Sequence, residues 1–164
     1  MTELTELAEK IKSLLLGSGR KIAVAESLTA GQIQATIAAA SGSSDYFAGG
    51  ITAYNIDQKV RLLGIDRSHA HSVNCVSERV SKEMAIGVCK AFGTHIGIAT
   101  TGYAEPCPHR QVEIPFAFIA IGINDQLRSL RVEIPELSRT EVQTKVAIIA
   151  IEALLEDVNS PDLQ

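Results

Sequence analysis

The chain has 164 residues, carries a formal net charge of −4, and is 46% apolar. A domain of this size buries about two-thirds of the surface of its unfolded chain, so we expect one domain over residues 1–164. The acidic balance and the lack of a basic run argue against nucleic acid as a partner. No apolar run approaches the roughly 18 residues of a membrane span, which argues against a membrane partner. Three cysteines without Cys-x-x-Cys spacing favour a cytoplasmic location.

The first half of the chain alternates between helical and extended patterns. Apolar residues recur one helical turn apart before Gly17, and a short apolar run follows this glycine. Five elements are expected: a helix over 3–16, a strand over 22–25, a helix over 32–40, a strand over 50–54 and a helix over 57–63.

The second half adds two helices and three strands. Ser77 is the expected N-cap of one helix, Gly93 is its terminator, and Asn124-Asp125 marks a hairpin turn. The expected elements are a helix over 77–92, strands over 96–100, 112–123 and 127–134, a helix over 140–156, and a disordered tail over 159–164. This alternation predicts an α/β fold, a three-layer α/β/α sandwich on a mixed β-sheet.

The strand over 22–25 runs into Glu26-Ser27-Leu28-Thr29-Ala30-Gly31, where apolar residues give way to polar and small ones. Strand-to-helix turns in α/β sheets are where ligands bind, because unpaired N–H groups and the positive end of the helix point outward there. A hydroxyl at such a turn is either a helix cap or a nucleophile, and the residues alone leave both interpretations open.

Longer patterns elsewhere in the chain repeat the spacing of a known family. They are Tyr46-Phe47-Ala48-Gly49-Gly50-Ile51-Thr52-Ala53-Tyr54-Asn55, Asp57-Gln58-Lys59-Val60-Arg61-Leu62-Leu63-Gly64, Val76-Ser77-Glu78 and Thr100-Thr101-Gly102-Tyr103-Ala104-Glu105-Pro106. With the Ser27 turn, they resemble the C-terminal domain of the CinA (competence/damage-inducible) family over about residues 5–156. The resemblance implies a CinA C-terminal-domain-like fold. Because the stand-alone form of that family is nicotinamide mononucleotide deamidase, it also implies hydrolysis of this small-molecule nucleotide to the nicotinate form and ammonia, without cofactor or metal.

The resemblance implies Ser27 as the nucleophile, with Tyr54 and Lys59 beside it. A serine hydroxyl needs a base to take its proton, and a lysine can be that base once burial lowers its pKa. Tyr54 would relay the proton or hold Lys59 in place. The ordinary alternatives are a solvated surface lysine and a core tyrosine whose hydroxyl reaches water.

Six further residues are expected to bind the substrate: Glu26, Thr29, Gly31, Thr101, Gly102 and Arg139. Backbone donors near Thr29 and Gly31, or in a turn at Thr101-Gly102, are the expected oxyanion stabilisers. Arg139 opens the last helix, where it would either bind a nucleotide phosphate or pair at the helix start.

The chain departs from the family pattern in and around this site. Leu28 replaces the family cysteine, Ala30 and Glu105 stand where the family has glycine, and Gln143 replaces an arginine. Bulky residues over 103–113 obstruct the close backbone approach that a glycine-rich loop permits, and Glu105 repels phosphate. The alternative function is therefore a catalytically weak or inactive paralogue that acts as a nucleotide-binding or interaction module.

Two further patterns bear on metals and assembly. His69-Ala70-His71 with Cys75, and Cys107 with His109, offer soft ligands, but zinc sites usually show tighter paired spacing, so no metal is expected. The last helix carries apolar residues beyond one stripe, which predicts a homodimer or higher homo-oligomer. These surplus residues are Ile148, Ile151 and Leu155.

Overall fold

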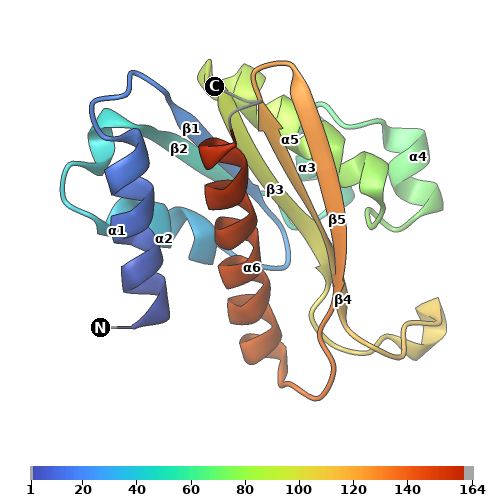
Figure 1. Ribbon diagram of the computed structural model, residues 1–164. Helices are drawn as coiled ribbons and strands as arrows, with labels where there is room; N and C mark the ends of the chain where they lie inside the picture. Colours follow the sequence, from blue (N-terminus) through green and yellow to red (C-terminus); the bar gives the residue numbers. More distant parts are fainter. Residues whose placement is uncertain (1, 161–164) are drawn as a thin grey trace.

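The computed structural model describes residues 2–160, and a five-stranded mixed sheet runs through its centre (Figure 1). The strands lie in the order β2-β1-β3-β4-β5. β1 pairs in parallel with β2 and β3, whereas β3, β4 and β5 form an antiparallel meander. The strand bounds are β1 (Ile22–Glu26), β2 (Phe47–Thr52), β3 (Ile96–Tyr103), β4 (Phe116–Ile123) and β5 (Gln126–Glu133).

Helices cover both faces of this sheet, so the predicted three-layer α/β/α sandwich on a mixed sheet is confirmed. One face carries α1 (Glu3–Leu15), α2 (Gln32–Ala39) and α6 (Arg139–Asn159), and the other carries α3 (Ile56–Leu63), α4 (Arg67–Ser72) and α5 (Glu78–Phe92). Two short 3-10 turns, Ser43–Asp45 and Pro108–Arg110, complete the described elements.

The interior strand β1 is an unbroken apolar run apart from its last residue, Glu26. All five of its residues are buried, because helices pack on both faces of the sheet at this point. Ile22 and Val24 belong to the core under α1, α2 and α6, while Ala23 and Ala25 face α5. The small alanine face lets α5 approach the sheet closely.

The β2 strand begins and ends earlier than expected, so Tyr54 follows the strand instead of closing it. Position 49, within β2, is a glycine because the Phe92 ring occupies the space that a Cβ would need. The β3 strand is longer than expected and includes Thr101 and Gly102. The turn expected at these two residues is therefore wrong. Its partner β4 supplies the pairing residues, from Phe116 opposite Tyr103 onward.

Three expectations about helices and ends need correction. The α4 helix was not expected, although Asp66 caps it by accepting a hydrogen bond from the His69 backbone N–H. The strand expected from residue 112 begins only at Phe116, whereas the hairpin turn at Asn124-Asp125 is confirmed. The expectation of a disordered tail from residue 159 is wrong for Asn159, which is the last residue of α6. Residues 161–164 of that expected tail lie outside the described part.

Two of the three surplus apolar residues of α6 are buried within the chain, and the third, Leu155, is half-buried. Ile151 is fully buried and Ile148 is 6% exposed, because α6 packs against both the sheet and α1. A homo-oligomer stays a prediction. Most of the apolar surface of α6 that motivated it is covered by other parts of the same chain. Within residues 2–160, no helix combines the length and apolar character needed to cross a bilayer.

A buried carboxylate holds the start of α2. Glu26, the last residue of β1, is fully buried and accepts hydrogen bonds from the backbone N–H groups of Gly31, Ile33 and Gln34 at 2.9–3.1 Å. Gly31 is the N-cap residue, has a φ of 97°, and makes no side-chain cap of its own. Glu26 therefore replaces the usual serine or threonine cap and complements the positive end of the helix.

We expect Glu26→Gln to lower the free energy of unfolding by about 2 kcal/mol or more, because an amide loses the charge and sets one N–H group against another. Urea denaturation measures this loss. The matched control is Glu152→Gln at an exposed position on α6, which should stay within about 0.5 kcal/mol of wild type. A loss for Glu26→Gln as small as the control would contradict this role.

The α3 and α5 helices touch through a glycine. A Cβ at Gly87 would overlap the backbone carbonyl of Leu63 at the end of α3. The absence of a side chain at Gly87 therefore determines how closely α3 docks against α5.

Gly87→Ala should destabilise the fold by about 1–3 kcal/mol, because backbone atoms must move to make room. Differential scanning calorimetry against the neighbouring control Ile86→Ala, at a residue 42% exposed, measures this. Equal stability of the two variants would show that α3 can shift without cost.

Candidate active site

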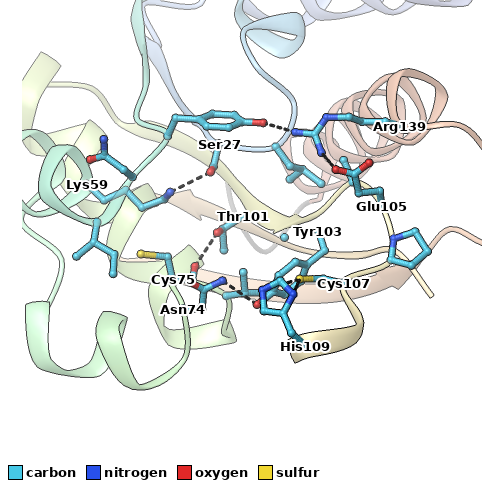
Figure 2. Close-up of a pocket in the computed structure, with 18 of the residues that line it drawn as sticks. Ser27, Lys59, Asn74, Cys75, Thr101, Tyr103, Glu105, Cys107, His109 and Arg139 are labelled. Carbon is cyan, nitrogen blue, oxygen red and sulfur yellow. Dashed lines mark hydrogen bonds and ion pairs between the residues drawn. The ribbon is translucent and has the colours of Figure 1, made fainter. Parts of the chain in front are cut away.

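A cavity of about 550 Å³ opens where the parallel strands end (Figure 2). Because β1, β2 and β3 are parallel, the residues that follow their carboxyl ends meet at one edge of the sheet. The cavity is lined by the turn after β1, the segment that joins β2 to α3, the end of β3 with its following loop, and the first residue of α6. The segment between α4 and α5, residues 74–76, also lines it, so five distant parts of the sequence form one pocket.

Ser27 and Lys59 are in direct contact in this cavity. The Lys59 Nζ donates to the Ser27 Oγ at 2.9 Å, and the two residues are 2% and 8% exposed respectively. Ser27 is the first residue after β1, as the apolar-to-polar break predicted. Asn55 caps α3 by accepting a hydrogen bond from the Gln58 N–H, and this fixes the helix turn that carries Lys59.

The environment of Lys59 favours its neutral form. Burial lowers the pKa of Lys59, while the nearby Cys75 acts weakly in the opposite direction. No carboxylate within residues 2–160 forms an ion pair with it. The ordinary interpretation of Lys59 as a solvated surface lysine is therefore wrong, and the amine has the position and the environment of a base.

Tyr54 lies at the mouth of the cavity and is 54% exposed, so it is no core residue. Its hydroxyl accepts a hydrogen bond from Arg139 Nη2 at 2.8 Å. In the described part of the chain it bonds to neither Ser27 nor Lys59, so the expected support of Lys59 by Tyr54 is not seen. Tyr54 instead orients the arginine.

Arg139 also forms an ion pair at the cavity wall. Its Nη1 lies 2.7 Å from Glu105 Oε1, and it is the first residue of α6. Ser138 and Glu141 form a capping box at the same helix start, so Arg139 is not needed as a cap. Its guanidinium is directed to the cavity, as its interpretation as a ligand-binding residue requires.

The other expected binding residues divide into two groups. Thr101 and Gly102 line the cavity, although both lie within β3. Glu26, Thr29 and Gly31 are not among the lining residues: Thr29 is fully buried with its hydroxyl 2.8 Å from that of Thr100, and Glu26 takes up the Gly31 N–H. These three residues support the turn and do not line the cavity.

Some of the oxyanion donors expected near Ser27 are engaged within the protein, and one next to Ser27 is open in the described part of the chain. The Gly31 N–H is occupied by Glu26, and Gly102 lies in a strand opposite Ala117. Leu28 follows Ser27, lines the cavity, and its N–H has no hydrogen-bond partner within residues 2–160. An N–H next to the nucleophile is the usual geometry of such a donor.

Sequence reasoning missed the strained wall opposite Ser27. Asn74 and Cys75 adopt left-handed φ values of 50° and 61°, which ordinary side chains rarely do. The Thr101 hydroxyl donates to the Cys75 carbonyl at 2.7 Å, and the Asn74 side-chain amide donates to the Tyr103 hydroxyl at 3.0 Å (Figure 2). Only the tolerance of asparagine for this conformation was visible in the sequence.

The soft ligands singled out in the sequence lie in separate environments. His69 is on α4, where its Nε2 lies 2.9 Å from the Ser77 hydroxyl, and the Cys107 sulfur is 3.6 Å from both ring nitrogens of His109. Over residues 2–160, no three His, Cys, Asp or Glu side chains gather in a way that would hold a metal ion.

Comparison with known proteins gives the family. The family model of the CinA C-terminal domain matches residues 4–158. A CinA-like protein from Flavobacterium psychrophilum is 45% identical over 102 residues, which are 62% of this chain and 24% of that protein. A CinA-like protein from Rippkaea orientalis is 38% identical over 119 residues, which are 73% of this chain and 28% of that protein. The chain spans less than a third of the length of these two relatives.

Solved structures give the same fold. A competence or damage-inducible protein from Enterobacter asburiae has a TM-score of 0.89 at 22% identity, over 97% of this chain and all of that one. The competence/damage inducible protein CihA from Agrobacterium tumefaciens has a TM-score of 0.86 at 24% identity, over 98% of each chain. Identity this low supports the fold alone, but the family model spans nearly all described residues, and the chain belongs to the CinA C-terminal domain family.

Proposed function

We propose that the chain is a serine amidohydrolase that converts nicotinamide mononucleotide to the nicotinate form and ammonia. The observation that carries this proposal is the buried contact between Lys59 Nζ and Ser27 Oγ at 2.9 Å, in the wall of a cavity large enough for a small ligand. A nucleophile in hydrogen-bond contact with a desolvated base is the arrangement that serine-based amide hydrolysis uses. Membership of the CinA family agrees with this proposal.

In the first step, neutral Lys59 takes the hydroxyl proton of Ser27 while the Ser27 oxygen attacks the carbon of the substrate amide. The negative charge then develops on the amide oxygen, where the Leu28 N–H is available as a donor. When the tetrahedral species collapses, the carbon–nitrogen bond breaks and the protonated Lys59 gives its proton to the departing nitrogen. Ammonia leaves, and Ser27 holds the acyl group as an ester.

In the second step, Lys59 takes a proton from water, and the resulting hydroxide attacks the ester carbon. Collapse releases the carboxylate and returns the proton to Ser27. One amide and one water thus give one carboxylate, one ammonia and one proton released to solvent, with Ser27 and Lys59 restored. In this scheme, Lys59 and Ser27 are the side chains that exchange protons with each other, the substrate and water.

A second candidate function is a nucleotide-binding module without turnover. The observation that favours loss of turnover is the ion pair between Glu105 and Arg139, because it opposes the phosphate contact that would position the substrate for reaction. An assay of ammonia release together with thermal protection by the nucleotide separates the candidates. Protection without ammonia favours the binding module.

Ser27→Ala should abolish ammonia release from nicotinamide mononucleotide while leaving the unfolding temperature close to that of wild type. The reason is that only the attacking oxygen is removed, and a unit of nucleophile and base loses nearly all activity with either member. A coupled ammonia assay measures the rate, and Ser43→Ala, an alanine substitution of a serine that does not line the cavity, is the control. Turnover that survives Ser27→Ala would remove Ser27 from the mechanism.

The rate should rise with pH until it passes the lowered pKa of Lys59, because only the neutral amine can accept the serine proton. On the acidic side, about a tenfold rise per pH unit is expected. Lys59→Arg, whose charge is permanent, should be inactive across the range. A rate that shows no acidic limb, or that keeps rising up to the ordinary lysine value of 10.5, would contradict the role of Lys59.

The same shift has a readout that does not depend on turnover. Because the pKa of Lys59 is lowered in the folded state, the unfolded chain binds more protons between the lowered value and the ordinary value of 10.5. Stability conferred by this site is lowest below the shifted pKa and rises through that window. Lys59→Met should therefore gain stability relative to wild type at neutral pH, and the gain should shrink as pH approaches the ordinary value.

A further inference from the structure

Both terminal nitrogens of Arg139 are occupied by the protein itself. Nη1 lies 2.7 Å from Glu105 Oε1, and Nη2 donates to the Tyr54 hydroxyl at 2.8 Å. All three residues line the same cavity. The Glu105–Arg139 pair lies to one side of the Ser27–Lys59 pair in Figure 2, so it would contact a part of the ligand remote from the reacting amide.

Arg139 is the group in this cavity best suited to an oxyanion. The other lysine or arginine of the lining is Lys59, whose amine is buried and engaged with Ser27. A guanidinium presents paired N–H donors that fit a phosphate, but here a carboxylate already takes one of them. The side chains of Arg139 and Glu105 are 44% and 61% exposed, so water and ligands reach the pair.

We propose that Glu105 is an internal counter-ion that weakens the binding of phosphate to Arg139 and sets the preference of the site between phosphorylated and unphosphorylated ligands. A phosphate must displace the Glu105 carboxylate and also lie close to it once bound. A ligand with a neutral hydroxyl at the same place meets neither obstacle. As a statement about substrate selection, this inference rests on the proposed function, whereas as a statement about phosphate binding it does not.

The size of the effect follows from the exposure of the pair. Exposed ion pairs are weak, so the phosphate can displace Glu105, but the remaining repulsion between two anions in contact opposes binding. Together these effects predict that Glu105→Gln binds a phosphate ligand about tenfold more tightly than wild type. Because both effects are electrostatic, the ratio should fall as salt is raised.

Isothermal titration of the full chain with ribose 5-phosphate tests this directly, because that probe has a phosphate and no amide to react. Wild type, Glu105→Gln and Glu113→Gln are compared at low and high salt. Glu113 is an exposed carboxylate on the same loop that does not line the cavity, so its substitution controls for the change in net charge. Adding Arg139→Gln to Glu105→Gln should remove the gain.

A gain of about tenfold for Glu105→Gln alone, reduced by salt and lost with Arg139→Gln, is the expected result. Equal affinity of wild type and Glu105→Gln, including undetectable binding by both, would overturn the proposal. So would an equal gain for Glu113→Gln, because the effect would then be one of overall charge.

Kinetics separate this proposal from the proposed function. With nicotinamide mononucleotide, Glu105→Gln should lower KM about tenfold and leave kcat unchanged, while KM for the phosphate-free nicotinamide riboside should not change. Tighter binding of ribose 5-phosphate without ammonia release by any variant would refute the amidohydrolase and retain the role of Glu105. Ammonia release with a KM that Glu105→Gln does not change would retain the amidohydrolase and refute the role of Glu105.

Discussion

The hydrogen bond between Lys59 and Ser27 is the interaction on which the site depends. It places an amine out of water with a hydroxyl as its polar partner, and no carboxylate in the described residues pairs with it. A charged amine in such a place is unfavourable, so folding itself shifts Lys59 toward the neutral form. The burial that weakens the fold at this point is the same burial that lowers the pKa of Lys59 and so favours the uncharged amine that a base requires.

Several parts of the fold hold this pair in position. The parallel strands end at one edge of the sheet, which brings the turn after β1 beside the start of α3. Glu26 fixes the helix that follows Ser27, and the bare backbone of Gly87 lets α3 dock where Lys59 reaches that turn. The far side of the cavity is charged and exposed, and there Glu105 and Arg139 bear on which ligand enters and not on the bond that breaks.

The layered fold and the Ser27–Lys59 pair could be predicted from the sequence, because both leave local signals. The apolar run of β1 and its break at Glu26 placed Ser27, and the spacing shared with the CinA family pointed to Lys59. Features that arise from tertiary contacts could not be predicted in this way. Glu26 was expected at the substrate because nothing local shows that its carboxylate caps α2, and the burial of Ile151 depends on α1 packing against α6. The left-handed backbone at Cys75 likewise depends on the Thr101 side chain in a distant strand.

The most direct test of the buried Lys59–Ser27 pair is the pKa of Lys59, measured by NMR titration of protein with 13C-labelled lysine and assigned by loss of the signal in Lys59→Met. A neutral base requires a pKa below the ordinary value of 10.5, with the exposed lysines titrating near that value in the same sample. A Lys59 signal that titrates together with the exposed lysines, or above them, would contradict the role of Lys59 as the base that activates Ser27.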